Sequence, residues 1–156
     1  MNYYLNIGTN LGNRRGNLYR AVVALTLQMG NIATSRIVAS KPWGYHSNNE
    51  FLNVGVLVRS HLQPHDMLQR LQALERKLGS GSHRDEQGNY ADRVVDIDII
   101  AIDDLVIDTP TLQVPHPRMH LRPFVLQPMA QLAPTWRHPV LHATAAQLLE
   151  RLSQQD

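Results

Sequence analysis

Short segments of the chain alternate apolar and polar residues with period two, and the longer segments between them carry apolar residues three or four positions apart. The first pattern is typical of half-buried strands and the second of amphipathic helices. Strands are therefore predicted over residues 3–7, 31–40, 51–58, 94–101 and 105–107. Helices are predicted over residues 18–29, 63–78, 124–132 and 143–152.

This order of elements indicates an α+β fold. A strand, a helix, two strands, a helix and a strand make the ferredoxin-like βαββαβ arrangement, an antiparallel sheet with helices on one face, here followed by extra C-terminal helices. Gly30 and Gly79 stand where the first two helices should end. With 156 residues and 43% hydrophobic content, the chain is expected to form a single domain over residues 1–156.

The predicted strand over residues 94–101 contains two acidic residues in an otherwise apolar run. With period two, Asp96 and Asp98 share one face. The apolar residues on the other face are Val95, Ile97, Ile99 and Ala101. On a central strand, two adjacent carboxylates would lose hydration and repel each other, so a cation is expected between them, and oxygen ligands suit Mg²⁺. The alternative is an edge strand whose polar face is in water.

The predicted strand over residues 51–58 also has two different faces. Four branched apolar residues form one face, while Phe51, Asn53 and Gly55 form the other. An aromatic ring, a carboxamide and a glycine that permits close approach suit a flat polar heterocycle such as a pterin or a purine. The alternative is that Phe51 packs in a second small core and Asn53 caps a loop.

Composition excludes some classes of protein without choosing a reaction. The 15 Lys and Arg against 13 Asp and Glu give a net charge of +2, too small to indicate binding to nucleic acid or to an anionic membrane. There is no Cys, which excludes disulfides and thiolate chemistry, and the eight His have no zinc-ligand spacing. No signal-like segment or apolar run of roughly 18 residues is present, so a cytoplasmic protein is expected.

Loop residues offer further ligand contacts. Residues 80–92 are predicted to form a long loop that leads straight into the acidic strand. Long loops beside a candidate metal site are often lids. Arg84 in this loop and Arg93 at its end could meet phosphate charge, or be solvated basic residues. The proline-rich segment 114–124 carries two His and two Arg, which suggests an anionic ligand near the carboxylates.

Arg-x-x-Asp-x-Asp at residues 93–98, followed by Pro-His-Pro-Arg-Met at residues 115–119, is the most specific combination of motifs in the chain. Nearly the whole chain then resembles the hydroxymethyldihydropterin pyrophosphokinases, which transfer pyrophosphate from ATP to 6-hydroxymethyl-7,8-dihydropterin in folate biosynthesis and release AMP. The other matching features are the glycine turn at residues 8–12, the Phe51-Leu52-Asn53 strand start, Gln72 with Glu75, and Arg122 with Phe124.

The resemblance implies roles for individual residues. Asp96 and Asp98 would hold two Mg²⁺ ions that bridge the ATP phosphates, and Arg93 would join them in catalysis. ATP contacts are implied for Gln72, Glu75, Arg84, Arg93, His116 and Arg122. Pterin contacts are implied for Pro42, Trp43, Phe51, Asn53 and Phe124, with Phe51 and Phe124 stacking on the ring. Without the resemblance, Gln72 and Glu75 would be expected to be a solvated pair on one helix face.

The chain departs from the family pattern in its phosphate-binding loop. Tyr90-Ala91-Asp92 stands where the family usually has Trp-Gly-Pro, and Arg84 is the one strongly basic residue within loop 80–92. Two alternatives therefore stay open: a divergent paralogue that binds a pterin or nucleotide without this catalysis or acts on another acceptor, and another metal-dependent nucleotidyl transferase.

An RNA-recognition domain has the same element order but is disfavoured. It would need a basic face with exposed aromatics, where this chain carries Asp96 and Asp98. The expected ligands are therefore ATP, a pterin and Mg²⁺, without nucleic acid or membrane, and a monomer is expected.

Overall fold

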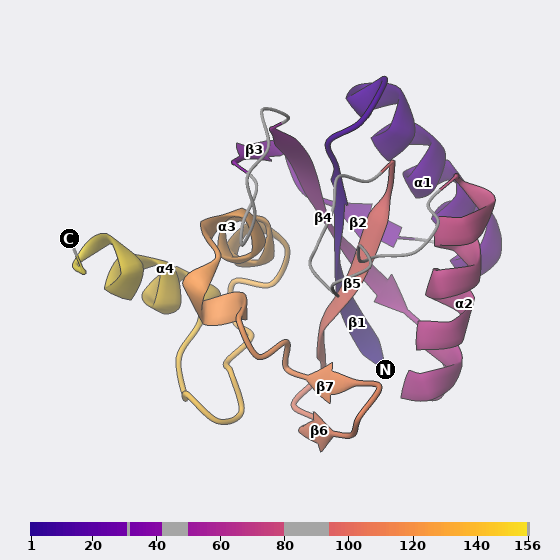
Figure 1. Cartoon of the computed structure of the whole chain (residues 1–156). Coiled ribbons are helices and arrows are strands. Elements are labelled where there is room, and N and C mark those ends of the chain that lie inside the picture. Colours follow the sequence, from indigo (N-terminus) through magenta and orange to yellow (C-terminus); the bar gives the residue numbers. More distant parts are fainter. Residues whose placement is uncertain (31, 42–49, 80–93, 156) are drawn as a thin grey trace.

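The computed structural model describes residues 1–30, 32–41, 50–79 and 94–155. Its strands are β1 (Asn2–Thr9), β2 (Ile32–Thr34), β3 (Val38–Ser40), β4 (Phe51–Arg59), β5 (Asp96–Ile102), β6 (Ile107–Asp108) and β7 (Gln113–Val114). Its helices are α1 (Arg14–Met29), α2 (Pro64–Lys77), α3 (Pro123–Leu132) and α4 (Ala145–Ser153), with a short 3-10 helix, η1 (Met119–Leu121). The fold is α+β with an antiparallel sheet, as predicted (Figure 1).

Five strands form the main sheet in the order β2-β4-β1-β5, and β3 also pairs with β4. The prediction of a single strand over residues 31–40 is wrong, because two short strands, β2 and β3, lie there. Between them Ser35 interrupts the regular pairing, because its hydroxyl accepts the backbone N–H of Gly55 at 2.8 Å. Both short strands still pair with β4, so the outer edge of the sheet is built from two pieces.

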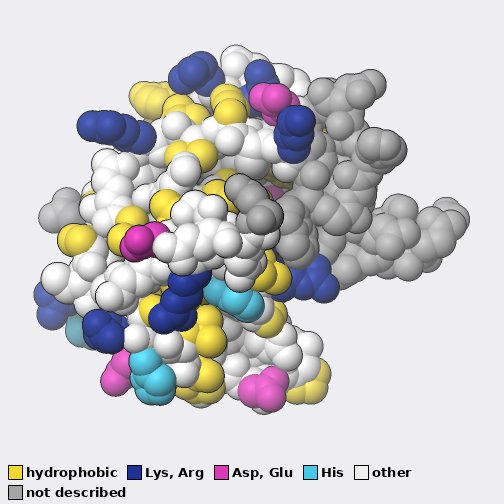
Figure 2. Space-filling model, turned by 90° about the vertical axis from the view of Figure 1, so that its left-hand side faces the viewer, with side chains coloured by type: hydrophobic (Ala, Val, Ile, Leu, Met, Phe, Trp, Pro, Cys, Tyr) yellow, Lys and Arg dark blue, Asp and Glu magenta, His cyan; other side chains and the backbone are white. Residues whose placement is uncertain are grey.

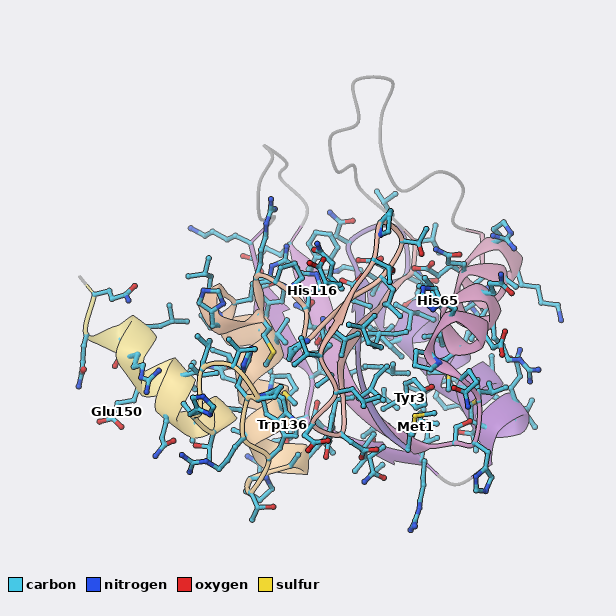
Figure 3. The ribbon with its side chains drawn as sticks, turned by 90° about the horizontal axis from the view of Figure 1, so that it is seen from below. Met1, Tyr3, His65, His116, Trp136 and Glu150 are labelled. Atoms are coloured by element: carbon cyan, nitrogen blue, oxygen red, sulfur yellow. The ribbon has the colours of Figure 1, made fainter. Side chains whose placement is uncertain are left out.

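Helices cover both faces of the sheet (Figure 1). On one face α1 and α2 enclose the larger apolar core, which includes Tyr3 and Leu71. On the other face α3 and α4 enclose a second core around Met129 and Trp136. Figure 3 shows Tyr3 and Trp136 on opposite sides of the sheet. The helices of the βαββαβ unit, α1 and α2, lie on one face as expected, and the extra C-terminal helices cover the other face, because their apolar residues also need a surface to pack against.

The outer surface of the α3 and α4 side carries charged side chains, unlike the apolar core beneath it. In Figure 2 the Lys and Arg side chains of this face stand singly among apolar and uncharged ones, and His side chains lie near some of them. Among the described helices, none is both long and apolar enough to cross a membrane.

β5 occupies a different place from the one expected. It forms an edge of the sheet beside β1, so the two acidic residues do not lie on a central strand. The pairing of β5 with β1 also shifts register: Leu5 lies opposite Ile99 and Tyr4 opposite Ala101, which leaves Ile100 as an extra residue. Such a bulge reverses the alternation. Ala101 consequently packs in the α3 and α4 core, and its predicted position beside Ile99 is wrong.

The return strand predicted over residues 105–107 is also wrong. After a turn at Asp103, whose φ is 47°, Leu105 and Val106 are exposed. β6 pairs with β7 instead of returning along β5. Thr109 holds this hairpin, because its hydroxyl both accepts the N–H of Leu112 and donates to the carbonyl of the same residue, each at 3.0 Å.

The helix ends follow the chemistry of their flanking residues. α1 begins earlier than predicted, at Arg14, because the Asn13 side chain accepts the N–H of Gly16 at 3.1 Å. It ends at Gly30 as predicted, with a φ of 85° that glycine tolerates. α4 begins with a capping box in which Thr144 and Gln147 bond each other's backbone.

Candidate functional site

The acidic pair lies on the same face of the sheet as α3, toward the end of β1 that leads into the glycine turn. Asp96 lies opposite Gly8 and Asp98 opposite Asn6 on β1, and both acids are half-buried. The shared face predicted for the two acids is confirmed. Two half-buried carboxylates that are two residues apart on one strand concentrate negative charge at the edge of the sheet.

A third carboxyl group, that of Glu75 on α2, lies behind this pair. Glu75 is only 2% exposed, and its Oε2 accepts the backbone N–H of Ile97 at 2.7 Å. Burial, the charge of Asp96, a hydrogen bond with the Asp96 side chain and the charge of Asp98 raise the pKa of Glu75 to about 9, against the opposing effect of the Ile97 N–H. The expectation that Glu75 and Gln72 form a solvated pair is wrong for Glu75, which joins α2 to the start of β5.

His116, labelled in Figure 3, and Arg118 bring donors to the cavity that Asp98 lines. The backbone N–H of His116 donates to the carbonyl of Ile100 at 2.8 Å, which fixes the segment against β5. Its Nδ1 accepts the N–H of Arg118 at 3.2 Å. Burial lowers the pKa of His116; the charge of Asp98 opposes this, and Arg122 and Arg118 reinforce it. The imidazole is therefore neutral at pH 7, with its proton on Nε2.

The three residues predicted to contact a heterocycle lie near the same strands. A Cβ at Gly8 would lie 3.2 Å from Asn53 Oδ1 and 3.3 Å from Phe51 Cδ1, so both side chains reach across this glycine. Asn53 donates through Nδ2 to the Val38 carbonyl and the Ser40 hydroxyl. The shared face predicted for Phe51, Asn53 and Gly55 is confirmed. The expected approach of a heterocycle to Gly55 is wrong, because Pro128 of α3 covers this glycine, and part of the Asn53 carboxamide holds β3.

Phe124 and Arg122 form a pair at the start of α3. The Arg122 Cζ lies 5.7 Å from the centroid of the Phe124 ring, a cation–π distance. Arg122 is buried, and its carbonyl accepts the N–H groups of Val125 and Leu126 as α3 begins. The N-terminus of α3 therefore fixes both residues next to each other.

A cavity of about 410 Å³ lies between β5 and the β6–β7 hairpin. Its polar walls include Asp98, His116 and Arg118, and its apolar walls include Leu68 and Leu112. This size and mixture suit a small ligand that has both an apolar and an anionic part. The cavity thus joins one residue of the acidic pair to the neutral histidine.

The sequence-based candidates omitted part of this cavity. Arg118 stands two residues after His116 in the most specific motif, so the motif could have identified it. Residues 109–113 carry no such signal, because a short hairpin of ordinary residues becomes a wall only when it folds against β5. Four predicted site residues lie outside the described ranges: Pro42, Trp43, Arg84 and Arg93.

The donor set suits a hard cation held partly by a ligand. Among the described residues, no group of three or more His, Cys, Asp or Glu side chains is arranged to hold a metal ion. Asp96 and Asp98 lie on one face of β5, and Asp98 lines the cavity. Mg²⁺ characteristically takes one or two carboxylates together with water and substrate phosphates. Burial is the main cause of the raised pKa of Glu75, and the charges of Asp96 and Asp98 add to it.

Comparison with known proteins agrees with this geometry. Residues 4–134 match the family model described as 7,8-dihydro-6-hydroxymethylpterin-pyrophosphokinase. The chain is 41% identical over 138 residues to 2-amino-4-hydroxy-6-hydroxymethyldihydropteridine pyrophosphokinase of Porphyromonas gingivalis, covering 87% of this chain and 92% of that protein. It is 35% identical over 131 residues to the protein of the same name from Bacillus subtilis, covering 83% and 76%.

Solved structures support the fold. The chain superposes on the HPPK-DHPS of Plasmodium falciparum with a TM-score of 0.73 and 14% identity, covering 99% of this chain and 44% of that one. It is also 38% identical over 141 residues to the folic acid synthesis protein FOL1 of Dictyostelium discoideum, of which it covers 21%. The chain therefore corresponds to one part of each of these longer proteins.

Proposed function

This chain belongs to the 7,8-dihydro-6-hydroxymethylpterin-pyrophosphokinase family, and we propose how its residues carry out the transfer of pyrophosphate from ATP to 6-hydroxymethyl-7,8-dihydropterin in folate biosynthesis. The observation that carries this proposal is the cavity that Asp98 and His116 share, because a carboxylate suited to a cation and an imidazole suited to donate a hydrogen bond to phosphate line the same space. Gly8, Phe51 and Asn53 lie on the same side of the sheet as the acidic pair.

ATP occupies the cavity between β5 and the β6–β7 hairpin. The apolar walls at Leu68 and Leu112 suit the base, and Arg118 suits the phosphates. His116 donates from Nε2 to a phosphate oxygen, a role supported by the hydrogen bond that its Nδ1 accepts from Arg118. A neutral donor adds a directed hydrogen bond without requiring low pH.

Asp96 and Asp98 would hold Mg²⁺ together with the ATP phosphates, and we expect two ions when ATP is bound. When bound, Mg²⁺ neutralises phosphate charge and stabilises the attacking and leaving oxygens. Glu75, protonated at pH 7, holds the start of β5 through Ile97 and hydrogen-bonds the Asp96 side chain, so it supports the position of Asp96. Whether Gln72 and Glu75 touch ATP directly stays a prediction.

The pterin lies near Phe51 and Asn53. Phe51 and Phe124 stack on its ring, and the pterin uses the face of Phe124 opposite Arg122. The hydroxymethyl oxygen attacks the β-phosphorus of ATP, the bond from the β-phosphorus to the oxygen shared with the α-phosphorus breaks, and AMP leaves with that oxygen. The hydroxymethyl proton passes to water as the new bond forms. Such transfer depends mainly on in-line positioning and charge neutralisation.

Other parts of the assignment are proposals of the same kind. The strand order supports a ferredoxin-like arrangement in a single domain with additional C-terminal helices. Arg84 and Arg93 are proposed to contact phosphate, with Arg93 joining catalysis, and Pro42 and Trp43 to contact the pterin. We also propose that the protein acts as a monomer.

The decisive experiment is AMP formation by the purified protein with ATP, Mg²⁺ and 6-hydroxymethyl-7,8-dihydropterin. Controls omit each component in turn. AMP released only in the complete mixture would establish the transfer and its dependence on Mg²⁺. No AMP, with pterin binding still visible by fluorescence, would favour a divergent paralogue, for which the Tyr90-Ala91-Asp92 departure is the specific observation.

A further inference from the structure

A buried carboxamide on β1 has no part in the reaction described above. Asn6 is only 6% exposed and lies on the α3 side of the sheet, directly across from Gly55 on β4 and Asp98 on β5. Within the described part of the chain, its buried Oδ1 accepts no hydrogen bond. A buried carbonyl without a donor lowers the stability of a folded protein, so its presence needs an explanation.

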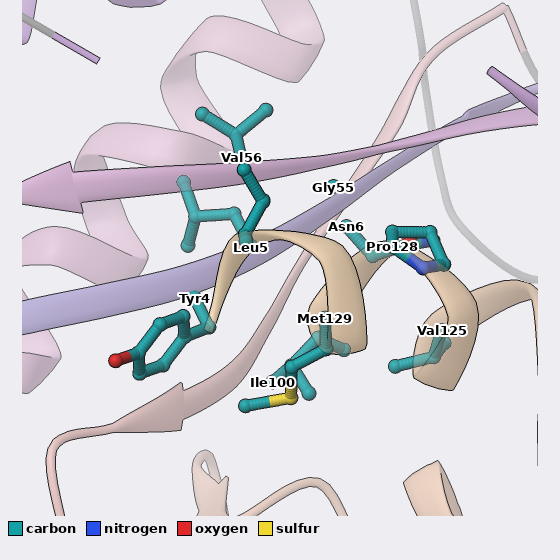
Figure 4. Close-up of a pocket in the computed structure, with 10 residues that line it drawn as sticks. Tyr4, Leu5, Asn6, Gly55, Val56, Ile100, Val125, Pro128 and Met129 are labelled. Atoms are coloured by element: carbon teal, nitrogen blue, oxygen red, sulfur yellow. The ribbon is translucent and has the colours of Figure 1, made fainter. Parts of the chain in front are cut away.

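The surroundings of Asn6 are mostly apolar (Figure 4). It lines a cavity of about 10 Å³ under α3, together with Val125 and Met129. Pro128 of α3 packs against Gly55, the residue opposite Asn6, so closely that a Cβ at Gly55 would lie 2.6 Å from the Pro128 Cβ. This space is at the lower limit for one water molecule. An apolar side chain would suit such walls better than a carboxamide, so packing alone does not account for Asn6.

The residue opposite Asn6 on β5, Asp98, offers an explanation. Asp98 and Asn6 face the same side of the sheet, and directly opposed residues have Cβ atoms about 5 Å apart. A carboxamide carries its N–H donors on the other side of Cγ from its acceptor. Because the Asn6 Oδ1 is inaccessible, the Nδ2 donors point away from the buried cavity. Carboxylates that bind a metal ion are themselves commonly held by further hydrogen bonds.

We propose that Asn6 is a positioning residue whose Nδ2 donates to the Asp98 carboxylate when Mg·ATP is bound and fixes the rotamer of Asp98. This inference rests on the proposed function, because it requires a cation and a nucleotide beside Asp98. The unpaired Oδ1 then follows from directing the donor end of Asn6 toward the site. Asn6 thus favours the loaded state more than the ligand-free protein.

Two variants and one control test this role. Asn6→Leu keeps the branching at Cγ but removes both polar groups, and Asn6→Ala removes everything beyond Cβ. Tyr4→Phe is the control, because Tyr4 lines the same cavity two residues away and the change removes only its hydroxyl. The thermal unfolding midpoint of each protein is measured without ligand and with Mg²⁺ plus α,β-methylene-ATP, an analogue whose α–β linkage cannot be cleaved.

We expect Asn6→Leu to unfold, without ligand, at the wild-type temperature or about 2–4 °C above it, because a buried unpaired group is lost. The ligand-induced shift should fall by half or more, and the Mg²⁺ concentration for half-saturation should rise about tenfold. Tyr4→Phe should keep the wild-type shift. Asn6→Ala should show the same loss of ligand response, and decides the question if the leucine variant does not fold.

A full ligand-induced shift and an unchanged Mg²⁺ requirement in the Asn6 variants would overturn the inference. That result, with a lowered ligand-free midpoint, would instead assign Asn6 to binding a buried water molecule. The wild-type protein separates this failure from that of the proposed function. If wild type itself shows no shift with Mg²⁺ and the analogue, nucleotide binding at this site is wrong whatever the variants do.

Discussion

The two faces of the sheet use the same strands for different purposes. On the α1 and α2 side, alternate residues are apolar and buried from Tyr3 to Ile7 in β1, from Leu52 to Val58 in β4, and at Ile97 and Ile99 in β5 before the bulge. On the α3 side, the intervening residues change character along the strands. The residues of this side that lie near Ile100 are covered by α3, whereas those paired with Asp96 and Asp98 are polar or glycine.

This difference shows how one sheet can be stable and still carry a site. Burial of a complete apolar face supplies stability, so the other face can place charged and polar groups close together. Neighbouring residues on one strand should then respond differently to substitution. Changes on the α1 and α2 side should reduce stability, and changes at the acidic end of the α3 side should reduce activity.

The largest effect is expected at Asp98. Asp98→Ala should reduce Mg·ATP-dependent AMP formation at least a hundredfold, because a carboxylate proposed to bind the cation is lost, while the protein still folds. AMP release and circular dichroism measure the two properties. Asp104→Ala, an exposed acid just past the other end of the same strand, is the control. Wild-type turnover in Asp98→Ala would remove Asp98 from the metal site.

Ile7 tests the opposite face at a neighbouring position. Ile7→Ala should lower the free energy of unfolding by about 3 kcal/mol, because a fully buried side chain is replaced by a cavity. Turnover by the molecules that remain folded should change little. Urea unfolding and kcat measured at low temperature separate the two quantities. A large fall in kcat without loss of stability would contradict the division between the faces.

Gly55 tests the part of the α3 side that packs rather than reacts. Gly55→Ala should lower the free energy of unfolding by about 2 kcal/mol, because the new Cβ would meet Pro128 Cβ at 2.6 Å and displace α3. Chemical denaturation measures this change. Ala39→Ser on β3, at an exposed position, provides the comparison. Unchanged stability in the alanine variant would mean that α3 shifts without loss of packing.

His138, beyond α3, should give the smallest effect. Its Nδ1 accepts the N–H groups of Val140 and Leu141 at 3.1 and 3.0 Å. Burial lowers the pKa of His138 below 6.5, and His120 and His142 reinforce this. Because the unfolded chain then binds more protons than the folded protein, stability should fall as the pH drops from about 6.5 through the folded-state pKa.

Unfolding measured between pH 7.5 and about pH 5 tests this dependence. His138→Asn should reduce the slope, since its side-chain oxygen can still accept the two N–H groups without titrating. His61→Asn, at an exposed position, should leave the slope unchanged. An unaltered slope in His138→Asn would assign the pH dependence to other groups.

Local pattern determined much of this protein. Alternation in β4 and in the first part of β5 correctly placed Asp96 and Asp98 on one face and Phe51 with Asn53 on the polar side of β4. Gly30 correctly marked the end of α1. The motifs around Asp96 and His116 identified the family. Each of these inferences depends on neighbours within a few residues, which is the range over which a sequence pattern reports structure.

Tertiary structure decided the rest. The bulge at Ile100 moved Ala101 to the α3 and α4 core, because one extra residue in the pairing reverses every later side chain. Packing of α2 against β5 buried Glu75, although its helical position alone suggested a solvated residue. That the Asn6 Oδ1 has no hydrogen-bond partner among the described residues likewise depends on which strand and helix lie across from it. A sequence pattern specifies the face that a side chain takes, whereas only the assembled fold specifies what that face meets.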